Sequence, residues 1–495
     1  MSRSFTIRSV GWLCFLGLAA SAWAALSLPH VINSNMVLQR DQPVPIWGWA
    51  TPRAPVTVVF AGQTRRATAD ANGRWQVRLR RLTTANVPAT MTISGDGSVI
   101  TLTNLLVGEV WLCSGQSNME KPIGLQRGQK PVGNFEAELA TGDAYPDIRL
   151  FKAQRVMAAT PASDVAGTWT VCSSNSLDAL KFSAAAYFFA RKLHQELGVP
   201  IGLVESAWGG TRVEPWTPPE GFRSVAAVAS LAGFSPGTNK LVNTMPGVLY
   251  NGMIAPLKPF ALRGVLWYQG ESNCMDVNDG DAYAAKFEAL IRGWRKLWRQ
   301  GDFPFYYVQL APYSYYSNRP TPRVVSPEEL PEIWEAQTHC LRLPHTGMAV
   351  ITDTVNNLKD IHPTDKQDVG LRLALLALNR TYGQRNVVCT GPLFDGARIQ
   401  SDRIVVRFRG TDAGLVARDG QPLNSFTIAG ADGRFVPANA RIDGDSVVVS
   451  SPAVASPKAV RFGWHELAQP NLANGAGLPA SSFRTDNPWA KKGGW

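Results

Sequence analysis

The stretch EVWLCSGQSNM, residues Glu109–Met119, combines a buried strand with a sharp turn. Residues Glu109–Cys113 are mostly apolar and predict a short strand, which the small residues at 114–115 break into a turn. Ser117 then stands at the tip of that turn. In α/β folds a serine placed in this way lies at the carboxyl edge of the sheet, where functional sites are held. An ordinary polar turn would give the same local pattern, so the surrounding chain decides between the two interpretations.

Strand-like and helix-like segments alternate on both sides of this stretch, over residues 107–385. The spacing of apolar residues over Ala184–Leu197 is helical and stops at Gly198. We expect further helices at 282–299 and 366–379, and strands at 201–205, 265–268, 305–310 and 347–352. This alternation predicts a mostly parallel sheet with helices on both faces.

The chain has 495 residues, which is too long for one ordinary core and predicts two or three domains. Short alternating runs separated by turns predict β-structure before and after the α/β segment. We expect a signal peptide at 1–24, a β-sandwich at 25–106, an α/β domain at 107–390, and a β-domain with a polar tail at 391–495.

Residues 1–24 carry the features of a secretory signal peptide: two early arginines, an apolar core over Val10–Ala20 and small residues at Ala22 and Ala24. No later stretch is apolar for long enough to span a membrane, so we expect export to the periplasm or the medium. Cleavage would lower the formal net charge from +11 to +9. Without basic runs, this charge does not indicate nucleic-acid binding.

Five cysteines remain after the predicted cleavage, an odd number with wide spacing and no CxxC pair. The pattern predicts neither a disulfide framework nor a metal site. Of these cysteines, Cys113 lies on the expected central strand and is expected to be a buried thiol.

A serine nucleophile needs a base, an orienting acid and donors for an oxyanion. Among six histidines, His362 has the best context, in the sequence Lys359–Pro363 between the last expected strand and the last helix. Asp360 stands two residues before it. His362 is therefore the candidate base, which would take the Ser117 proton and return it to a leaving alcohol.

Two further turns follow expected strands. Gly209 and Gly210 allow a backbone N–H to approach a reacting carbonyl. Gln269 and Asn273, in QGESN at 269–273, offer side-chain amides at the same edge. The Ser117 N–H, a glycine N–H and an amide together would form an oxyanion hole.

Four motifs taken together resemble the sialate O-acetylesterase-like branch of the SGNH (GDSL-type) hydrolases. They are GQSNM at 115–119, WGGTRVEPW at 208–216, WYQGESN at 267–273 and DIHPTDKQDVGLRLA at 360–374. Segments 30–49 and 471–486 also resemble that branch, so the resemblance covers nearly the whole mature chain. It implies a flavodoxin-like α/β/α three-layer core flanked by β-domains, and metal-free, cofactor-free deacetylation of O-acetylated sugars.

Carried over by motif, the resemblance implies Ser117 as nucleophile, His362 as base and Asp360 as acid. It implies an oxyanion hole of the Ser117 N–H, Gly210 and Gln269. The chain departs from the family twice. Only one residue separates Asp360 from His362, so Asp353 at the end of the last strand remains a competitor. The third motif lacks the common Gly-x-Asn-Asp form, so Asn273 remains a rival to Gln269.

Residues Arg212, Glu214 and Trp216 follow the glycine turn and are candidates either for lining a sugar site or for bracing that loop. The loop containing Tyr313, Tyr315 and Tyr316 is a candidate for stacking on a sugar ring. Glu271 is expected to fix loops by hydrogen bonds rather than to act as a catalytic acid.

The sequence therefore favours an exported carbohydrate O-acetylesterase. O-acetylated sialic acid and acetylated xylan or xyloglucan are both consistent with the resemblance. Two other functions stay open: a non-catalytic sugar-binding protein that retains a hydrolase fold, and an esterase for aryl or lipid esters. The sequence does not indicate an oligomeric state.

Overall fold

The structure is a computed structural model that describes residues 25–235, 240–275, 279–318 and 326–487. The expected signal peptide at 1–24 lies outside the described residues, as do the last eight residues of the expected tail. Within the described ranges, no helix combines the length and the apolar character needed to cross a membrane.

The strand β7, Ser98–Gly115, is the centre of the molecule and runs for 18 residues. Its second half pairs in parallel with β10 (Ile201–Ala207) and β11 (Gly264–Tyr268). Its first half pairs antiparallel with β6 (Ala85–Gly95), and its middle pairs with β1 (Val37–Gln39). The strand expected at Glu109–Cys113 is thus part of the second half of a much longer strand. The boundary expected at residue 106 falls inside this strand.

The central sheet has the order β13-β12-β11-β7-β10-β8-β9. The strands not yet named are β13 (Thr346–Ala349), β12 (Phe305–Val308), β8 (Ile148–Lys152) and β9 (Trp169–Val171). Every neighbouring pair along this order is parallel except β8 with β9. Parallel strands need helical crossovers, and the helices cover both faces. The α/β class expected from the sequence is confirmed.

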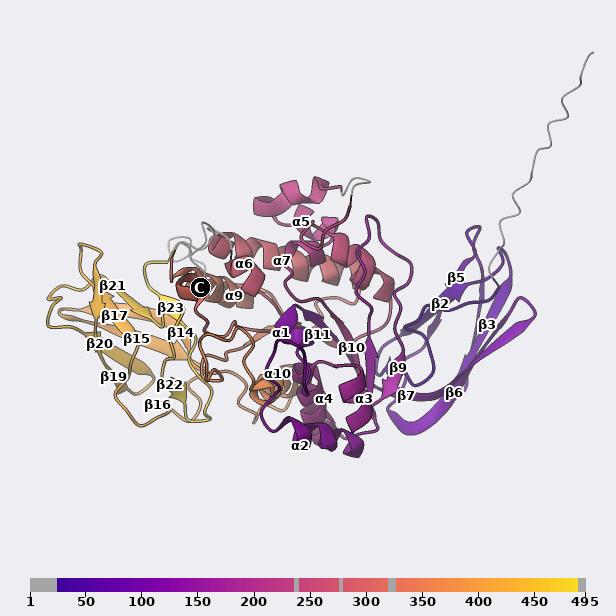
Figure 1. Cartoon of the computed structure of the whole chain (residues 1–495), viewed down its shortest axis with the longest axis horizontal. Coiled ribbons are helices and arrows are strands. Elements are labelled where there is room, and N and C mark those ends of the chain that lie inside the picture. The colour runs from indigo at the N-terminus through magenta and orange to yellow at the C-terminus, as the bar shows by residue number, and fades with distance from the viewer. Residues whose placement is uncertain (1–24, 236–239, 276–278, 319–325, 488–495) are drawn as a thin grey trace, which may run out of the picture.

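The four long helices divide between the two faces of the central sheet (Figure 1). Helices α4 (Ala184–Leu197) and α10 (Lys366–Arg380) pack against each other on one face. Helices α7 (Asp279–Trp298) and α9 (Glu329–His339) pack together on the other. The shorter helices are α1 (Ser117–Glu120), α2 (Phe135–Ala140), α3 (Ser174–Ala179), α5 (Pro219–Arg223), α6 (Glu271–Cys274) and α8 (Tyr315–Asn318).

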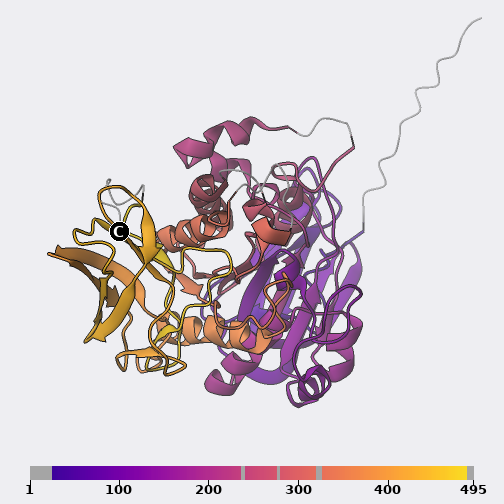
Figure 2. The ribbon, with the colours of Figure 1, turned by 60° about the vertical axis from the view of Figure 1, so that its left-hand side comes forward.

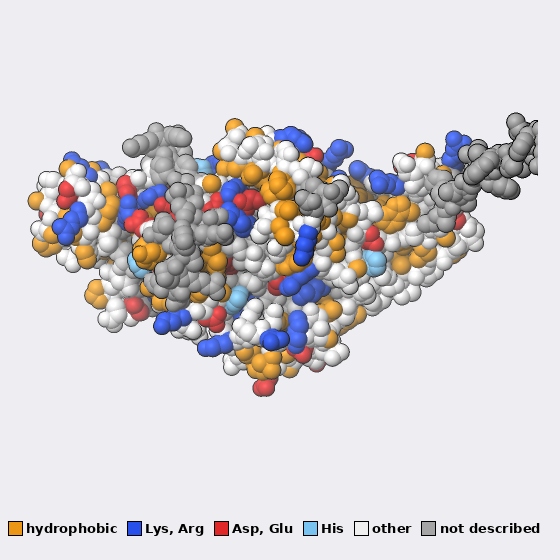
Figure 3. Space-filling model, turned by 45° about the horizontal axis from the view of Figure 1, so that its top comes forward, with side chains coloured by type: hydrophobic (Ala, Val, Ile, Leu, Met, Phe, Trp, Pro, Cys, Tyr) orange, Lys and Arg blue, Asp and Glu red, His pale blue; other side chains and the backbone are white. Residues whose placement is uncertain are grey.

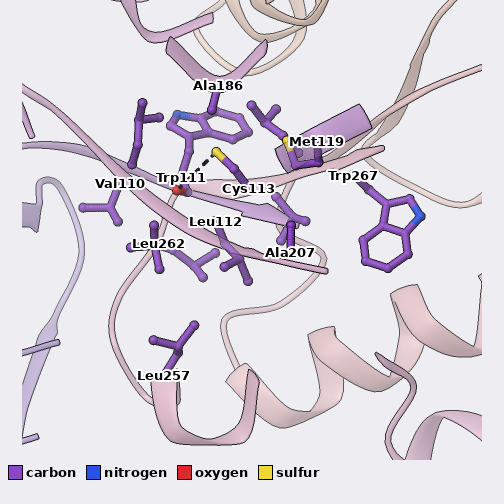
Figure 4. Close-up of a cluster of buried hydrophobic side chains, with 14 of the residues drawn as sticks. Val110, Trp111, Leu112, Cys113, Met119, Ala186, Ala207, Leu257, Leu262 and Trp267 are labelled. Carbon is purple, nitrogen blue, oxygen red and sulfur yellow. Dashed lines mark hydrogen bonds between the residues drawn. The ribbon is translucent and has the colours of Figure 1, made fainter. Parts of the chain in front are cut away.

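Side chains alternate between the two faces along β7, as a strand requires. Trp111 and Cys113 point toward α4, whereas Leu112 points toward Leu257 and the opposite layer (Figure 4). The Trp111 ring lies 5.0 Å from the Phe189 ring of α4. The second half of β7 is buried on both faces, so its sequence is a mostly continuous apolar run rather than an alternating one.

β-Structure flanks the core at both ends (Figures 1 and 2). At the N-terminal end, β3 and β4 extend the sheet of β6 and β7, and β2 pairs with β5. These strands are β2 (Val44–Trp49), β3 (Pro55–Phe60), β4 (Gln63–Thr68) and β5 (Arg74–Leu79). The burial of β3 alternates strictly, which explains why its sequence was readable as a strand.

The C-terminal strands form two four-stranded sheets and one pair around a separate apolar core. They are β14 (Leu393–Gln400), β15 (Arg403–Arg409), β16 (Leu415–Ala417), β17 (Phe426–Ala429), β18 (Phe435–Pro437), β19 (Asn439–Asp443), β20 (Ser446–Ser450), β21 (Ala459–Phe462), β22 (Leu472–Asn474) and β23 (Phe483–Arg484). A buried ion pair of 2.8 Å between Arg484 and Glu335 joins this region to α9. Lys and Arg are scattered among Asp and Glu over the face in Figure 3, rather than gathered in one patch.

Candidate active site

The turn after β7 places Ser117 at the first position of α1. Gly115 has a φ of +141°, and a methyl group there would lie 2.1 Å from the carbonyl oxygen of Tyr268. Only glycine fits where the end of β7 lies this close to the backbone of its paired strand β11. Ser117 is half-buried, and among the described residues its backbone N–H has no hydrogen-bond acceptor. Its hydroxyl and its N–H are thus both presented at the carboxyl edge of the sheet.

The loop between β13 and α10 brings His362 to the same edge. The Nε2 atom of His362 lies 3.0 Å from Oγ of Ser117, a hydrogen-bond distance. A base must reach the proton that it abstracts, and this geometry meets that requirement.

The two candidate acids have different environments. The Oδ1 atom of Asp360 accepts the backbone N–H of His362 at 2.9 Å and lies 4.0 Å from its Nδ1 atom. Asp353 instead forms a two-point ion pair with Arg372, at 2.6 and 2.8 Å. Of the two acids, Asp360 is therefore the one beside the imidazole, although its carboxylate now holds the backbone rather than the ring.

The pKa of His362 is lowered from its usual 6.5 to about 4. Burial is the main cause, followed by the positive charges of Lys366 and Lys121, while Asp360 opposes the shift. The imidazole is neutral at ordinary pH and its Nε2 atom can accept the serine proton.

The turn Gly209–Gly210, the candidate oxyanion turn, lies against Ser117. A methyl group on Gly209 would lie 3.1 Å from Cβ of Ser117, so this turn lies directly against the nucleophile. The N–H of Gly209 donates to Oε2 of Glu120 at 2.6 Å and is occupied. The N–H of Gly210, whose φ is +74°, has no acceptor among the described residues. Of the two glycines, Gly210 is therefore the one whose N–H bonds no acceptor within the described ranges.

The amide of Gln269 is fully buried and its donors are used within the protein. Its Nε2 atom contacts Asn273, Thr211 and Gln116, and its Oε1 atom accepts from Tyr283. The expectation of Gln269 as an oxyanion donor does not fit this arrangement, because the buried hydrogen bonds leave no N–H for a ligand.

The rival donor Asn273 is also occupied, since its Nδ2 atom donates to Glu214 and Asp279. Sequence reasoning passed over Gln116, the residue before the nucleophile. Its Oε1 atom accepts from Ser272 N–H at 3.2 Å, while its Nε2 atom has no acceptor among the described residues. Gln116 is thus a further candidate donor, whose Nε2 atom bonds no acceptor in the part of the chain that the structure describes.

Arg212, Glu214 and Trp216 form part of the protein interior or its ion pairs. Trp216 is fully buried and its indole N–H donates to Thr211. Glu214 is buried between Arg212 and Lys286, at 3.1 and 2.7 Å. The expectation that Glu214 and Trp216 line a sugar site is contradicted by this burial. These side chains brace the loop that carries Gly210.

The tyrosine loop is also mostly internal, since Tyr313 is 8% and Tyr315 2% exposed, whereas Tyr316 is 41% exposed. Glu271 is buried, and its Oε1 atom accepts from Asn118 at 2.6 Å, beside the nucleophile. This agrees with the expected loop-fixing role of Glu271.

Arg155 and Trp208 contact each other next to α1 and the glycine turn, and neither is a candidate from the sequence. The guanidinium of Arg155 lies 5.7 Å from the centre of the Trp208 ring and bonds Glu120 through Nη2 at 2.6 Å. The Arg155 side chain is half exposed. Because Glu120 ends the helix that Ser117 begins, this cation stands at the rim of the site.

The cysteines do not compete with Ser117 as nucleophiles. Burial raises the pKa of Cys113 well above its usual value and that of Cys172 to about 12. Both thiols are therefore protonated at neutral pH, and a protonated thiol is a poor nucleophile.

The sequence of this chain matches known proteins over the region of the site. The family of carbohydrate esterases described as sialic acid-specific acetylesterases matches residues 107–377. Sialate O-acetylesterase of Homo sapiens is 33% identical over 405 residues, which cover 75% of this chain and 74% of that protein. The protein of that name from Rattus norvegicus is 32% identical over 446 residues, covering 78% and 80%.

A solved structure is similar over almost the full length. The crystal structure of a carbohydrate acetylesterase from Xanthomonas citri has 38% identity and a TM-score of 0.83. The similarity covers 94% of this chain and 100% of that one. The core is thus the SGNH-type α/β/α hydrolase core with additional β-sheets, as the resemblance implied. The chain belongs to the sialate O-acetylesterase family of carbohydrate esterases and is a carboxylic ester hydrolase.

Proposed function

We propose that this protein removes O-acetyl groups from sugars through an acetyl-enzyme formed on Ser117. The observation that carries the proposal is the 3.0 Å contact between Oγ of Ser117 and Nε2 of His362. The free N–H groups of Ser117 and Gly210 beside it support the same chemistry, since both can bind an oxyanion.

In the first half of the reaction, His362 takes the hydroxyl proton of Ser117 as Oγ attacks the acetyl carbonyl carbon. The carbonyl oxygen becomes an oxyanion, for which the N–H groups of Ser117 and Gly210 are the candidate backbone donors and the Gln116 amide is a candidate side-chain donor. One such donor is worth roughly 3–4 kcal/mol in the transition state. The C–O bond to the sugar then breaks, and the imidazolium returns its proton to the sugar oxygen.

In the second half, water replaces the sugar alcohol. His362 takes one proton of the water, whose oxygen attacks the acetyl carbon of the ester on Ser117. Collapse of the second tetrahedral intermediate releases acetate and gives the proton back to the serine oxygen. Asp360 acts as the acid whose charge stabilises the imidazolium, since its Oδ1 atom lies 4.0 Å from Nδ1 of His362.

The substrate is either O-acetylated sialic acid or acetylated xylan or xyloglucan. Arg155 offers a half-exposed guanidinium at the rim of the site, and guanidinium groups pair well with carboxylates. This feature supports an acidic sugar. We also propose that residues 1–24 direct export, so that the enzyme meets its substrate in the periplasm or outside the cell.

The test is acetate release from the three acetylated substrates by the wild type, Ser117→Ala and Ser98→Ala. Ser98 is an exposed residue at the start of β7, far along the strand from Ser117, so its replacement controls for loss of a serine hydroxyl away from the site. Acetate release by the wild type and by Ser98→Ala, with loss in Ser117→Ala, supports the proposal and identifies the sugar.

Two outcomes would favour the other functions. Sugar binding without acetate release would indicate a binding protein. Activity that rises with acyl chain length on 4-nitrophenyl esters would indicate a lipid or aryl esterase.

A further inference from the structure

A fully buried lysine, Lys366, begins helix α10 four residues after His362. Its Nζ atom donates to Oδ1 of Asn118 at 2.9 Å and to the carbonyl oxygen of Pro363 at 2.7 Å. Removing an ammonium from water is strongly unfavourable unless its hydrogen bonds and charge are met inside the protein. The two hydrogen bonds of the Lys366 ammonium therefore offset part of the free-energy cost of burying it.

Asn118, the residue after Ser117, continues these contacts. Its Nδ2 atom donates to the carbonyl oxygen of Ile361 at 2.9 Å, and its Oδ1 atom accepts from Lys366. The carbonyl groups held in this way belong to the residues directly before and directly after His362. Asn118 and Lys366 thus hydrogen-bond the backbone on both sides of His362. Asn118 is also the residue next to Ser117, so these contacts link the two.

The polarity of the Asn118 amide matches the charges around it. Its NH₂ group also donates to Oε1 of Glu271 at 2.6 Å, while its oxygen faces the ammonium of Lys366. The ammonium lies 5.3 Å from the centre of the Tyr268 ring, a cation–π contact. Lys366, Asn118 and Glu271 are all at most 3% exposed. Because the Glu271 carboxylate lies on its NH₂ side and the Lys366 ammonium on its oxygen side, the Asn118 amide has one favourable orientation.

We propose that Lys366 is a positioning residue that, through Asn118 and the Pro363 carbonyl, sets the distance between Ser117 and His362. This role rests on the proposed function, because it gives the lysine a part in presenting the base to the nucleophile. Lys366 touches neither reacting atom itself. A displacement of about 1 Å between reacting groups can cost about 100-fold in rate.

The charge of Lys366 has a second effect on the same imidazole. It is the largest electrostatic cause that lowers the pKa of His362, ahead of Lys121. Burial and Lys121 lower the pKa of Lys366 itself to about 7, against the opposing charges of Glu271, Asp365 and Asp360. Removing this charge should therefore raise the pKa of His362 toward its usual value. Lys366→Arg keeps the positive charge, so it separates this effect from a gain of solvent around the imidazole.

The experiment compares Lys366→Met, Lys366→Arg and the control Lys296→Met, in which an exposed lysine of α7 is replaced. Each is assayed for kcat, KM and the pH dependence of kcat/KM with 4-nitrophenyl acetate. We expect Lys366→Met to lose about 100-fold in kcat with little change in KM. Its acidic limb should move to higher pH, and Lys366→Arg should recover part of both effects. The control should behave as the wild type.

A folded Lys366→Met protein with wild-type kcat and an unmoved acidic limb would overturn the proposal. If Lys366→Met does not fold, Asn118→Ala decides, since it removes the contact to Lys366 and the contact to Ile361. A similar loss of kcat supports the role, and wild-type kcat overturns it. If neither variant folds, the pair serves folding and the positioning role is rejected. A wild type that releases no acetate would instead refute the proposed function.

Discussion

The carboxylate of Glu120 accepts the backbone N–H of Gly209 at 2.6 Å, so the short helix that begins with Ser117 holds the glycine turn that faces it. The second oxygen of Glu120 bonds Arg155. With Gly209 fixed in this way, the N–H of the next residue, Gly210, bonds no acceptor among the described residues. One buried carboxylate therefore connects the oxyanion turn to the rim of the site.

Replacing Glu120 by alanine should release this turn. We expect kcat for acetate release to fall about 10- to 100-fold, somewhat less than the loss of an oxyanion donor itself. Glu120→Gln keeps an acceptor for Gly209 and should lose less. Steady-state kinetics on 4-nitrophenyl acetate measure the effect, with Glu196→Ala, an exposed glutamate of α4, as control. Equal kcat values for Glu120→Ala and the wild type would show that Gly209 needs no such anchor.

Replacing Asp360 and replacing Asp353, the two candidate triad acids, should have different effects on kcat and on the melting temperature. Asp360→Asn should lower kcat by 100-fold or more, in the manner of triad acids, while leaving the melting temperature nearly unchanged. Asp353→Asn should do the reverse, because it breaks the buried pair with Arg372, a change that typically costs about 3 kcal/mol or more. Kinetics and thermal unfolding on both variants give the comparison. The opposite pattern would make Asp353 the functional acid.

The acidic limb of kcat/KM should have its midpoint near pH 4, because the base must be neutral and the pKa of His362 is about 4. The same shift affects stability. Unfolded histidine takes up a proton below about pH 6.5 and folded His362 only near 4, so its contribution to stability falls as pH drops through that interval.

Acetate release between pH 3.5 and 8, with circular dichroism to verify folding, tests this expectation. The control is His465→Gln, which replaces an exposed histidine and should leave the limb in place. A midpoint near 6.5 in folded protein would contradict the environment described for His362.

Arg155→Gln should change the preference between substrates. If the guanidinium pairs with a sugar carboxylate, KM for O-acetylated sialic acid should rise about 10-fold, while KM for acetylated xylo-oligosaccharide should stay within about 2-fold. Added salt should weaken the wild type more than the variant on the acidic sugar. Arg407→Gln, at an exposed arginine of β15, is the control. Equal effects on both sugars would assign Arg155 to structural support of Glu120.

Local sequence patterns predicted those elements whose bounds are set by nearby residues, such as helix caps and the spacing of apolar side chains. Helix α4 has the predicted bounds, because Ser183 accepts the N–H of Ala186 at its start and Gly198 ends it with a φ of +63°. Helix α9 was not predicted, since Pro331 lies within its first turn and interrupts the expected pattern. The full length of β7 was also missed, because its two halves lie in different surroundings and follow different patterns.

The site could be predicted only in part. The turn around Ser117 and the loop of His362 carry distinctive sequences, and the structure places them in contact. Gln269 and Trp216 looked available because they follow strand ends, yet tertiary packing buries both. Lys366 looked like an ordinary helix residue. Burial is a property of the assembled fold, and no local spacing distinguishes a buried lysine from a solvated one.

The continuity of β7 bears on how this protein can be cut or recombined. The strand that ends beside Ser117 begins among the N-terminal β-strands and pairs with β6 there. A truncation or a gene crossover near residue 106 would divide one hydrogen-bonded strand, the strand whose end leads into the turn of Ser117. The N-terminal strands and the central sheet share β7, so chimaeras made between relatives should exchange the two together.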